Sequence, residues 1–538
     1  MADAEISRAS AVMASGTLVS RILGFIKAIM VVAVIGLTGG GADAFALANQ
    51  LPNNVYIIIV GGVLNAILVP QIIKAGLHSD GGAAFINRIT TLAIVLFGGA
   101  TVLATLAAPL LVALYAGTLV RGNADTFALA VSFAYWCLPQ IFFYALYTLL
   151  GEILNARKLY GPYTWAPVVN NVVAIMGLGL FLAVFGVMDS AVPTTEWTPT
   201  QIALLAGPAT LGIVVQALML FFFWRRVGLS YQPDFRWRGV GLGQLGRTAS
   251  WTFGLLITTQ IAGIVQTQVA AIATGSGASI AVMQNAWLIF ILPHSIATVS
   301  IGTAYFTRMS GHASTGDIVS LRADLSSSVR AISLIAVFSS VGLIVLSVPI
   351  SRVFTDNATD VLLLAQVVAA FLIGLVPFSI QFVLFRAFYA LGDTRTPFLI
   401  TLFQSGLYIP IAVACAFLPT QFIVLGLALG MSLVTLPQLV LTVYLLRRKV
   451  GSFRIGPTMR SLVVFAVASL SAAAIGVLIL WALGLFTDGF ALESRLSAIL
   501  TMAAAGGGMA AAYSGGLLAL GSSEFRGFVD LVRSRLQR

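Results

Sequence analysis

The stretch from Ala9 to Leu37, ASAVMASGTLVSRILGFIKAIMVVAVIGL, decides the fold class, because it is long and apolar enough to cross a membrane as one helix. Its only charged residues are Arg21 and Lys27. A charge at the centre of a bilayer costs at least about 2.5 kcal/mol, so we expect both side chains to face a wet cavity or an anion instead of lipid. A buried structural ion pair is the alternative, although this span contains no acid.

Arg21 and Lys27 are six residues apart, which is about 120° around an ideal helix. They share one cavity only if it is wide or if the helix bends, and Gly24 between them permits a bend. The nearest acid in sequence is Asp43, which follows the glycine-rich turn 38–42. Asp43 is therefore either the cap of the helix that starts there or a functional residue.

The composition of the whole chain is that of a polytopic membrane protein. Of its 538 residues 59% are hydrophobic and 9% are charged, and the mean hydropathy is +1.00. Walker loops, His/Glu zinc motifs and thiolate pairs are absent, so we expect neither an enzyme nor a metal site. Apolar runs predict an all-α protein with fourteen transmembrane helices, at about 9–37, 44–73, 85–117, 125–154, 164–187, 199–224, 246–274, 278–306, 328–350, 361–390, 397–418, 421–446, 460–486 and 496–520.

The distribution of basic residues predicts the orientation of these helices. If the N-terminus is cytoplasmic, 22 of the 29 Lys and Arg residues fall inside, and only Arg121, Arg352 and Arg495 fall outside. The positive-inside rule therefore favours two cytoplasmic termini. The net charge of +11 follows from this topology, so no nucleic-acid partner is needed to explain it.

Internal similarity predicts two pseudo-symmetric lobes of six helices, 1–227 and 228–449, followed by two C-terminal helices and a basic tail in 450–538. The small residues at 503–508 suit close packing of the last helix. Three landmarks recur at offsets of 241, 238 and 235 residues, namely Leu51-Pro52 as Leu292-Pro293, Pro139 as Pro377, and Gly161-Pro162 as Thr396-Pro397.

Other polar residues in or near the predicted spans have two interpretations each. His294 is either a packed, neutral histidine or part of a proton-linked step. The charged residues at corresponding ends of spans four and ten form either interfacial ion pairs or part of a functional site; they are Glu152, Arg157 and Lys158, and Arg386, Asp393 and Arg395.

Six motifs resemble one known family: SRILGF at 20–25, ADAF at 42–45, LPN at 51–53, LNAR at 154–157, PVVNN at 167–171 and RAFYALGDTRTP at 386–397. They resemble the MurJ (MviN) lipid II flippases of the multidrug/oligosaccharidyl-lipid/polysaccharide exporter superfamily. The resemblance implies a multi-pass protein of the bacterial cytoplasmic membrane. It would move lipid II, the undecaprenyl-pyrophosphate-linked peptidoglycan precursor, from the inner to the outer leaflet by alternating access.

The resemblance also implies a substrate site. The family's functional residues carry over to Arg21, Lys27 and Asp43, and Gly24 and Asn53 lie in the same motifs. Lipid II is the implied partner, and other proteins of cell-wall synthesis are further candidate partners. No cofactor is expected, and coupling to the membrane potential or to an ion stays open.

Two departures from the family concern the rest of the site. Tyr56 and Ile57 stand where the family often has an arginine pair, and Leu288 and Ile291 stand where it has an arginine and a glutamate. On the latter stretch the polar candidates for substrate binding are Gln284 and Asn285.

Two other functions are compatible with the same class of fold. The first is a cation-coupled drug exporter, or an exporter of other polyprenyl-linked oligosaccharides. A drug exporter would need buried acids where this chain has buried bases. The second is a non-transporting scaffold for cell-wall synthesis, which has no physical need for Arg21 and Lys27 in the membrane.

Overall fold

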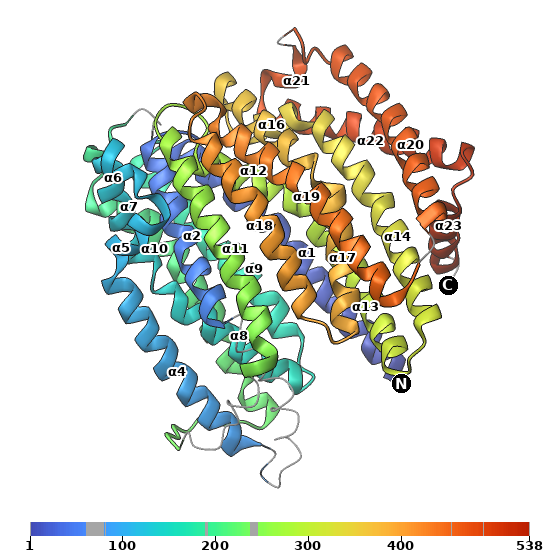
Figure 1. Cartoon of the computed structure of the whole chain (residues 1–538). Coiled ribbons are helices and arrows are strands. Elements are labelled where there is room, and N and C mark those ends of the chain that lie inside the picture. The colour runs from blue at the N-terminus through green and yellow to red at the C-terminus, as the bar shows by residue number, and fades with distance from the viewer. Residues whose placement is uncertain are drawn as a thin grey trace. The chain divides into compact units, whose positions relative to one another are not determined.

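The computed structural model describes residues 2–60, 80, 82–188, 192–236, 246–452, 455–487 and 489–536. Within these ranges the regular structure is helical and no β-strand occurs. The helices form two compact units, residues 1–281 and 282–538. Figure 1 shows that both units are built from helices joined mostly by short connections.

The predicted all-α polytopic class is confirmed, and the predicted spans can be compared with the helices. Twelve helices of the described residues are long and apolar enough to cross a membrane, and a pair of helices bent by 43° gives a thirteenth when it is counted as one span. These thirteen coincide with thirteen of the fourteen predicted spans. The other predicted span, 44–73, begins in helix α2 (Gly40–Val60) and then runs outside the described residues. The count of fourteen therefore stays a prediction.

In the first unit α9 packs against α10 and α1, α2 packs against α7, and α4 packs against α8. The α-helices are α1 (Ala2–Ile35), α2, α4 (Ala83–Leu106), α5 (Ala108–Ala116), α6 (Thr118–Gly122), α7 (Ala124–Cys137), α8 (Gln140–Ala156), α9 (Gly161–Phe185), α10 (Pro199–Leu218) and α11 (Gly246–Ala270). Short 3₁₀ turns are η1 (Thr194–Glu196), η2 (Met219–Phe223), η3 (Arg225–Val227) and η4 (Ala271–Ala273).

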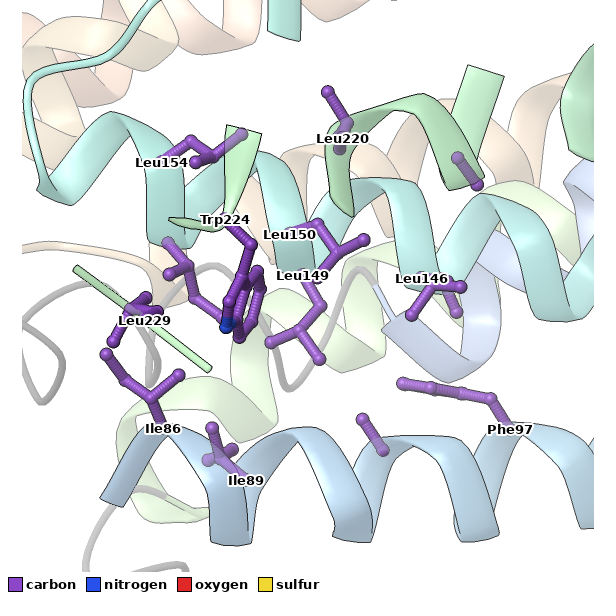
Figure 2. Packing of buried hydrophobic residues seen from close by; sticks show 14 of the residues in the cluster. Ile86, Ile89, Phe97, Leu146, Leu149, Leu150, Leu154, Leu220, Trp224 and Leu229 are labelled. Carbon is purple, nitrogen blue, oxygen red and sulfur yellow. The ribbon is translucent and has the colours of Figure 1, made fainter. Parts of the chain in front are cut away.

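Apolar side chains of α4, α8 and the segment after α10 form a core of the first unit. Figure 2 shows the Trp224 indole between α8, with Leu149 and Leu150, and α4, with Ile86. Burial of these side chains removes apolar surface from solvent and fixes α4 against α8.

The second unit contains the remaining helices and one π-helical turn. They are α12 (Ile280–Pro293), η5 (His294–Thr298, π-helical), α13 (Val299–Ser314), α14 (Ile318–Val345), α15 (Ser347–Phe354), α16 (Ala358–Leu372), α17 (Leu375–Ala390), α18 (Arg395–Cys415), α19 (Thr420–Val450), α20 (Ile455–Ala482), α21 (Phe490–Glu493), α22 (Arg495–Ala519) and α23 (Ser523–Leu536). The first two residues of α12 belong to the first unit.

Close helix contacts in the second unit depend on glycine. At the bend between α16 and α17, a Cβ on Gly374 would lie 2.8 Å from Ser432 Oγ, so a larger residue would push α19 away. Between α20 and α22, a Cβ on Gly508 would lie 2.5 Å from the Ile479 side chain. Of the small residues at 503–508, Ala505 is buried and Gly508 makes this close contact, whereas Ala503, Ala504 and Gly507 are exposed.

Four of the repeated landmark prolines lie at or directly before the first turn of a helix. Pro139 separates α7 from α8, and Pro162 lies in the first turn of α9. Pro377 and Pro397 lie in the first turns of α17 and α18. These positions match in pairs, as a repeat requires, and the division into lobes stays a prediction.

The units defined by packing differ from the predicted lobes in where α11 belongs. Gln268 of α11 donates hydrogen bonds through Nε2 to the carbonyl oxygens of Ala113 (3.0 Å) and Leu114 (2.7 Å) of α5. These bonds tie α11 to the first unit, whereas the predicted boundary at 227/228 rests on sequence repetition.

Candidate functional site

Helix α1, which carries Arg21 and Lys27, is held against α9 by a polar contact at a glycine. Asn171 of α9 donates from Nδ2 to the carbonyl oxygen of Ser20 at 2.9 Å. A Cβ on Gly24 would lie 3.7 Å from the same nitrogen. Ser20 and Gly24 are one turn apart, so they form the stripe of α1 that faces Asn171.

Arg21 lies three residues before Gly24, and Lys27 lies three residues after it. The two cations therefore flank this stripe on opposite sides. The helix stays α-helical through Gly24, so the two cations point about 120° apart. Arg21 is exposed and Lys27 is half-buried. Among the described residues neither side chain has an ion-pair or hydrogen-bond partner. The described part of the chain therefore offers no buried structural ion pair to explain them.

Asp43 is fully buried, with 0% of the residue exposed, and both carboxylate oxygens accept hydrogen bonds. Ser279 donates from Oγ to Oδ2 at 2.5 Å, and the backbone N–H of Ala281 donates to Oδ1 at 2.9 Å. Asp43 itself lies in the first turn of α2. Its carboxylate thus satisfies donors at the start of α12, and not those of its own helix as the cap interpretation proposed.

The glycines before Asp43 explain how it becomes buried. A Cβ on Gly40 would lie 2.6 Å from Thr126 Oγ1, and one on Gly41 would lie 2.8 Å from the Trp197 ring. Only glycine lets the start of α2 approach α7 and Trp197 this closely. This close approach places Asp43 in the interior of the first unit.

The Leu51-Pro52-Asn53-Asn54 motif places its two asparagines differently. Asn53, the predicted site residue, is exposed. Asn54 is buried, and Gln260 of α11 donates from Nε2 to the backbone carbonyl oxygen of Asn54 at 2.8 Å. Sequence reasoning missed Asn54 and Gln260, although a glutamine within the apolar span 246–274 was an available signal.

Tyr56, which departs from the family pattern, is part of an aromatic and hydroxyl cluster. Its hydroxyl lies 2.6 Å from Thr148 Oγ1, and its ring centroid lies 5.7 Å from that of Tyr144. The position thus supplies a neutral hydroxyl where the family often has a cation.

The candidates in the second unit are half-buried or packed. Gln284 and Asn285 are half-buried on α12. His294 is buried, with Nδ1 3.2 Å from Ser379 Oγ and its ring 4.7 Å from that of Phe378. This arrangement agrees with the interpretation of a packed histidine.

Two of the three charged residues of the 386–397 motif, Arg386 and Asp393, make different contacts. The guanidinium of Arg386 makes cation–π contacts with the rings of Phe306 (5.1 Å) and Phe382 (4.9 Å). Asp393 does form an ion pair, because Lys449 Nζ donates to its Oδ2 at 2.6 Å. Burial alone would raise the pKa of Asp393, but hydrogen bonds from Lys449 and Thr396 outweigh it and lower the pKa below its ordinary value.

Comparison with known proteins gives one family. Residues 32–501 match the family model described as lipid II flippase MurJ. A probable lipid II flippase MurJ of Rhizobium tropici is 28% identical over 390 residues, which cover 71% of this chain and 70% of that protein. A protein of the same description from Rickettsia prowazekii (strain Madrid E) is 24% identical over 415 residues, covering 74% of this chain and 76% of that one.

Solved structures agree in fold. The structure titled lipid II flippase MurJ, inward closed conformation, superposes with a TM-score of 0.69 at 20% identity and covers 92% of this chain and 97% of that chain. An inward-facing MATE family multidrug resistance transporter superposes with a TM-score of 0.56 at 16% identity, covering 81% and 93%. At these identities the likeness concerns the fold alone.

Proposed function

The chain belongs to the lipid II flippase MurJ family, and we propose that Arg21 and Lys27 of α1 hold the pyrophosphate of lipid II during its passage across the membrane. As a member of this family it is a multi-pass transporter of the bacterial inner membrane that moves lipid II. The observation that supports the site is that both cations lie within one apolar span and lack a partner among the described residues. Unneutralised cations in a membrane are expensive unless an anion accompanies them.

The chemistry of the two side chains suits a pyrophosphate. Arginine offers a planar fork of donors that matches two phosphate oxygens, and lysine is a point charge. Gly24 lies between the two cations, and the Asn171 amide of α9 packs against α1 at this point. Lipid II is negatively charged at its pyrophosphate, so a site with two positive charges favours lipid II over cationic drugs.

Asp43 acts as a latch in this proposal. Its two hydrogen bonds join the start of α2 to the start of α12, at the end of the helices that the basic-residue distribution assigns to the outside. Alternating access requires a contact that can break and re-form at each end of the path. We propose that the bonds of Asp43 hold the external end closed and that their release opens it.

The orientation follows from the same charge distribution, with both termini cytoplasmic and lipid II moving from the inner to the outer leaflet. A membrane-impermeant thiol reagent added from outside should label a single cysteine next to Asp356 but not one next to Arg236. Labelling at both positions, or at 236 alone, would contradict this topology.

Transport is tested by depleting the protein in cells that lack a second flippase. Lipid II should accumulate in the inner leaflet and disappear from the outer leaflet, and re-expression of the wild-type chain should restore its outward movement. A scaffold without transport would leave the distribution between leaflets unchanged while wall synthesis fails. Accumulation of a different polyprenyl-linked oligosaccharide would assign another exporter substrate.

A further inference from the structure

A cavity of about 760 Å³ lies in the second unit, between the start of α14, the start of α20 and the start of α23. Its wall carries three arginines, Arg322, Arg330 and Arg460, and one acid, Glu524. These residues lie at the same end of the helices as the segment 447–460, which is rich in basic residues. The distribution of basic residues in the sequence assigns this end to the cytoplasm. The residues of the proposed pyrophosphate site, Arg21 and Lys27, are not part of it.

Only part of the positive charge is neutralised by the protein. Glu524 accepts a hydrogen bond from Arg330 Nε at 2.8 Å and another from Ser461 Oγ at 3.0 Å. Arg322 donates from Nε to the carbonyl oxygen of Val450. Arg460 is exposed and has no ion-pair or hydrogen-bond partner among the described residues. Three arginines against one carboxylate leave two positive charges on the wall.

Ser326 provides an independent sign that a ligand is expected here. It lines the cavity, is only 4% exposed, and its hydroxyl has no hydrogen-bond partner in the described part of the chain. A buried hydroxyl without a hydrogen-bond partner is energetically unfavourable. An anion in the cavity would accept the hydrogen bond that Ser326 can donate.

From these contacts we infer that the cavity binds a phosphate-bearing anion, with Arg460 and Ser326 as direct donors. The guanidinium forks of Arg322 and Arg460 suit phosphate oxygens, and the positive end of the α20 dipole, at Gly456 and Pro457, adds to the field. Such a group has two sources, the headgroup of an anionic phospholipid and free phosphate in the cytoplasm.

The apolar surroundings of the cavity suit a lipid. Val319 lines it and is 75% exposed. Val463 is an exposed residue three positions after Arg460 and therefore lies on a neighbouring face of α20. Acyl chains could cover these side chains while the headgroup phosphate enters the cavity.

The inference is tested by thermal unfolding of the full-length purified protein in detergent. Phosphatidylglycerol, phosphatidylcholine and inorganic phosphate are each titrated, because a ligand that binds only the folded state raises the unfolding midpoint. Phosphatidylglycerol should raise the midpoint and phosphatidylcholine should not. Arg460→Gln and Ser326→Ala should each raise the half-saturating concentration of phosphatidylglycerol, with Arg460→Gln giving about a tenfold change.

Arg447→Gln is the matched control, because Arg447 is an exposed arginine of the same basic segment that does not line the cavity. It removes the same charge and should change the half-saturating concentration less than twofold. Stabilisation by inorganic phosphate, lost in Arg460→Gln, would assign the site to a free anion; stabilisation by phosphatidylglycerol alone would assign it to a headgroup. No stabilisation by either probe, or equal effects of Arg460→Gln and Arg447→Gln, would overturn the inference. None of these outcomes depends on transport of lipid II.

Discussion

Ser279 donates a hydrogen bond of 2.5 Å to Asp43, a residue 236 positions earlier in the chain. With the second bond, from the N–H of Ala281, it joins the first turn of α2 to the start of α12. Both oxygens of a fully buried carboxylate are thereby satisfied, which a buried charge requires. This contact gives the proposed external latch its physical basis.

Substitutions at Asp43 and Ser279 should separate charge from hydrogen bonding. Asp43→Ala removes both bonds and should abolish or strongly reduce flipping. A charge-assisted hydrogen bond contributes about 1.5–3 kcal/mol, so each bond that is lost lowers the stability of the closed state by a factor of roughly 10 to 100. Ser279→Ala removes only one bond and should have a smaller effect. Lipid II translocation at matched expression is the measurement.

Asp43→Asn is the control for the latch, because asparagine keeps the acceptor for Ala281 but carries no charge. Intermediate activity is expected. Full activity of Asp43→Asn together with loss in Asp43→Ala would show that transport requires the hydrogen bonds of Asp43 but not its charge.

A covalent bond in place of this latch should stop transport. A cysteine pair at 42 and 279, next to the hydrogen bond between Asp43 and Ser279, is designed to form a disulfide across this contact. Oxidation should block flipping and a reductant should restore it. Single cysteines at 42 or 279 control for the oxidant, and the native Cys137 and Cys415 are buried. Undiminished transport by the fully cross-linked pair would exclude opening at this end.

Stability should depend on pH through Asp393. Because its pKa is lowered in the folded protein, its contribution is fully present above the ordinary pKa of about 3.9 and is lost as the pH falls through the lower folded value. The difference in unfolding midpoint between wild type and Asp393→Asn should be constant from about pH 8 to 5 and should shrink below about pH 4. Other acids titrate in both proteins and cancel in this difference. A difference that stays constant down to pH 3 would contradict the assignment.

The fold class was predictable from the sequence because the constraint that a membrane imposes is local. A span must be long and apolar by itself, so hydropathy located thirteen spans that the structure describes as helices. Arg21 and Lys27 were predictable as candidates for the same reason, since a charge in an apolar span is visible without a partner.

The partners of these residues were not predictable, because they depend on how helices pack. Nothing near Asp43 in sequence indicates Ser279, and nothing near Ser20 indicates the Asn171 amide. Of the charged residues in the 386–397 motif, Asp393 forms an ion pair with Lys449, whereas Arg386 lies over two phenylalanine rings that its sequence context does not indicate. Single residues thus reveal that a site exists, whereas its contacts require the tertiary structure.

Variants of Arg21 and Lys27 are expected to differ because the two cations present different donors. Lys27→Arg keeps the charge and adds donors, so it should be tolerated, and Lys27→Ala should impair flipping. Arg21→Lys keeps the charge but loses the fork, so it should be weak or inactive. Equal behaviour of Arg21→Lys and Lys27→Arg would contradict a site in which the fork of Arg21 binds the phosphates.

The most direct test of the pyrophosphate site is lipid II translocation by Arg21→Ala, measured at wild-type expression with membrane insertion verified. Removing an exposed side chain that has no partner among the described residues should leave folding intact, so a loss of transport reports on the substrate. The account predicts that Arg21→Ala abolishes the movement of lipid II to the outer leaflet. Translocation at the wild-type rate would contradict it.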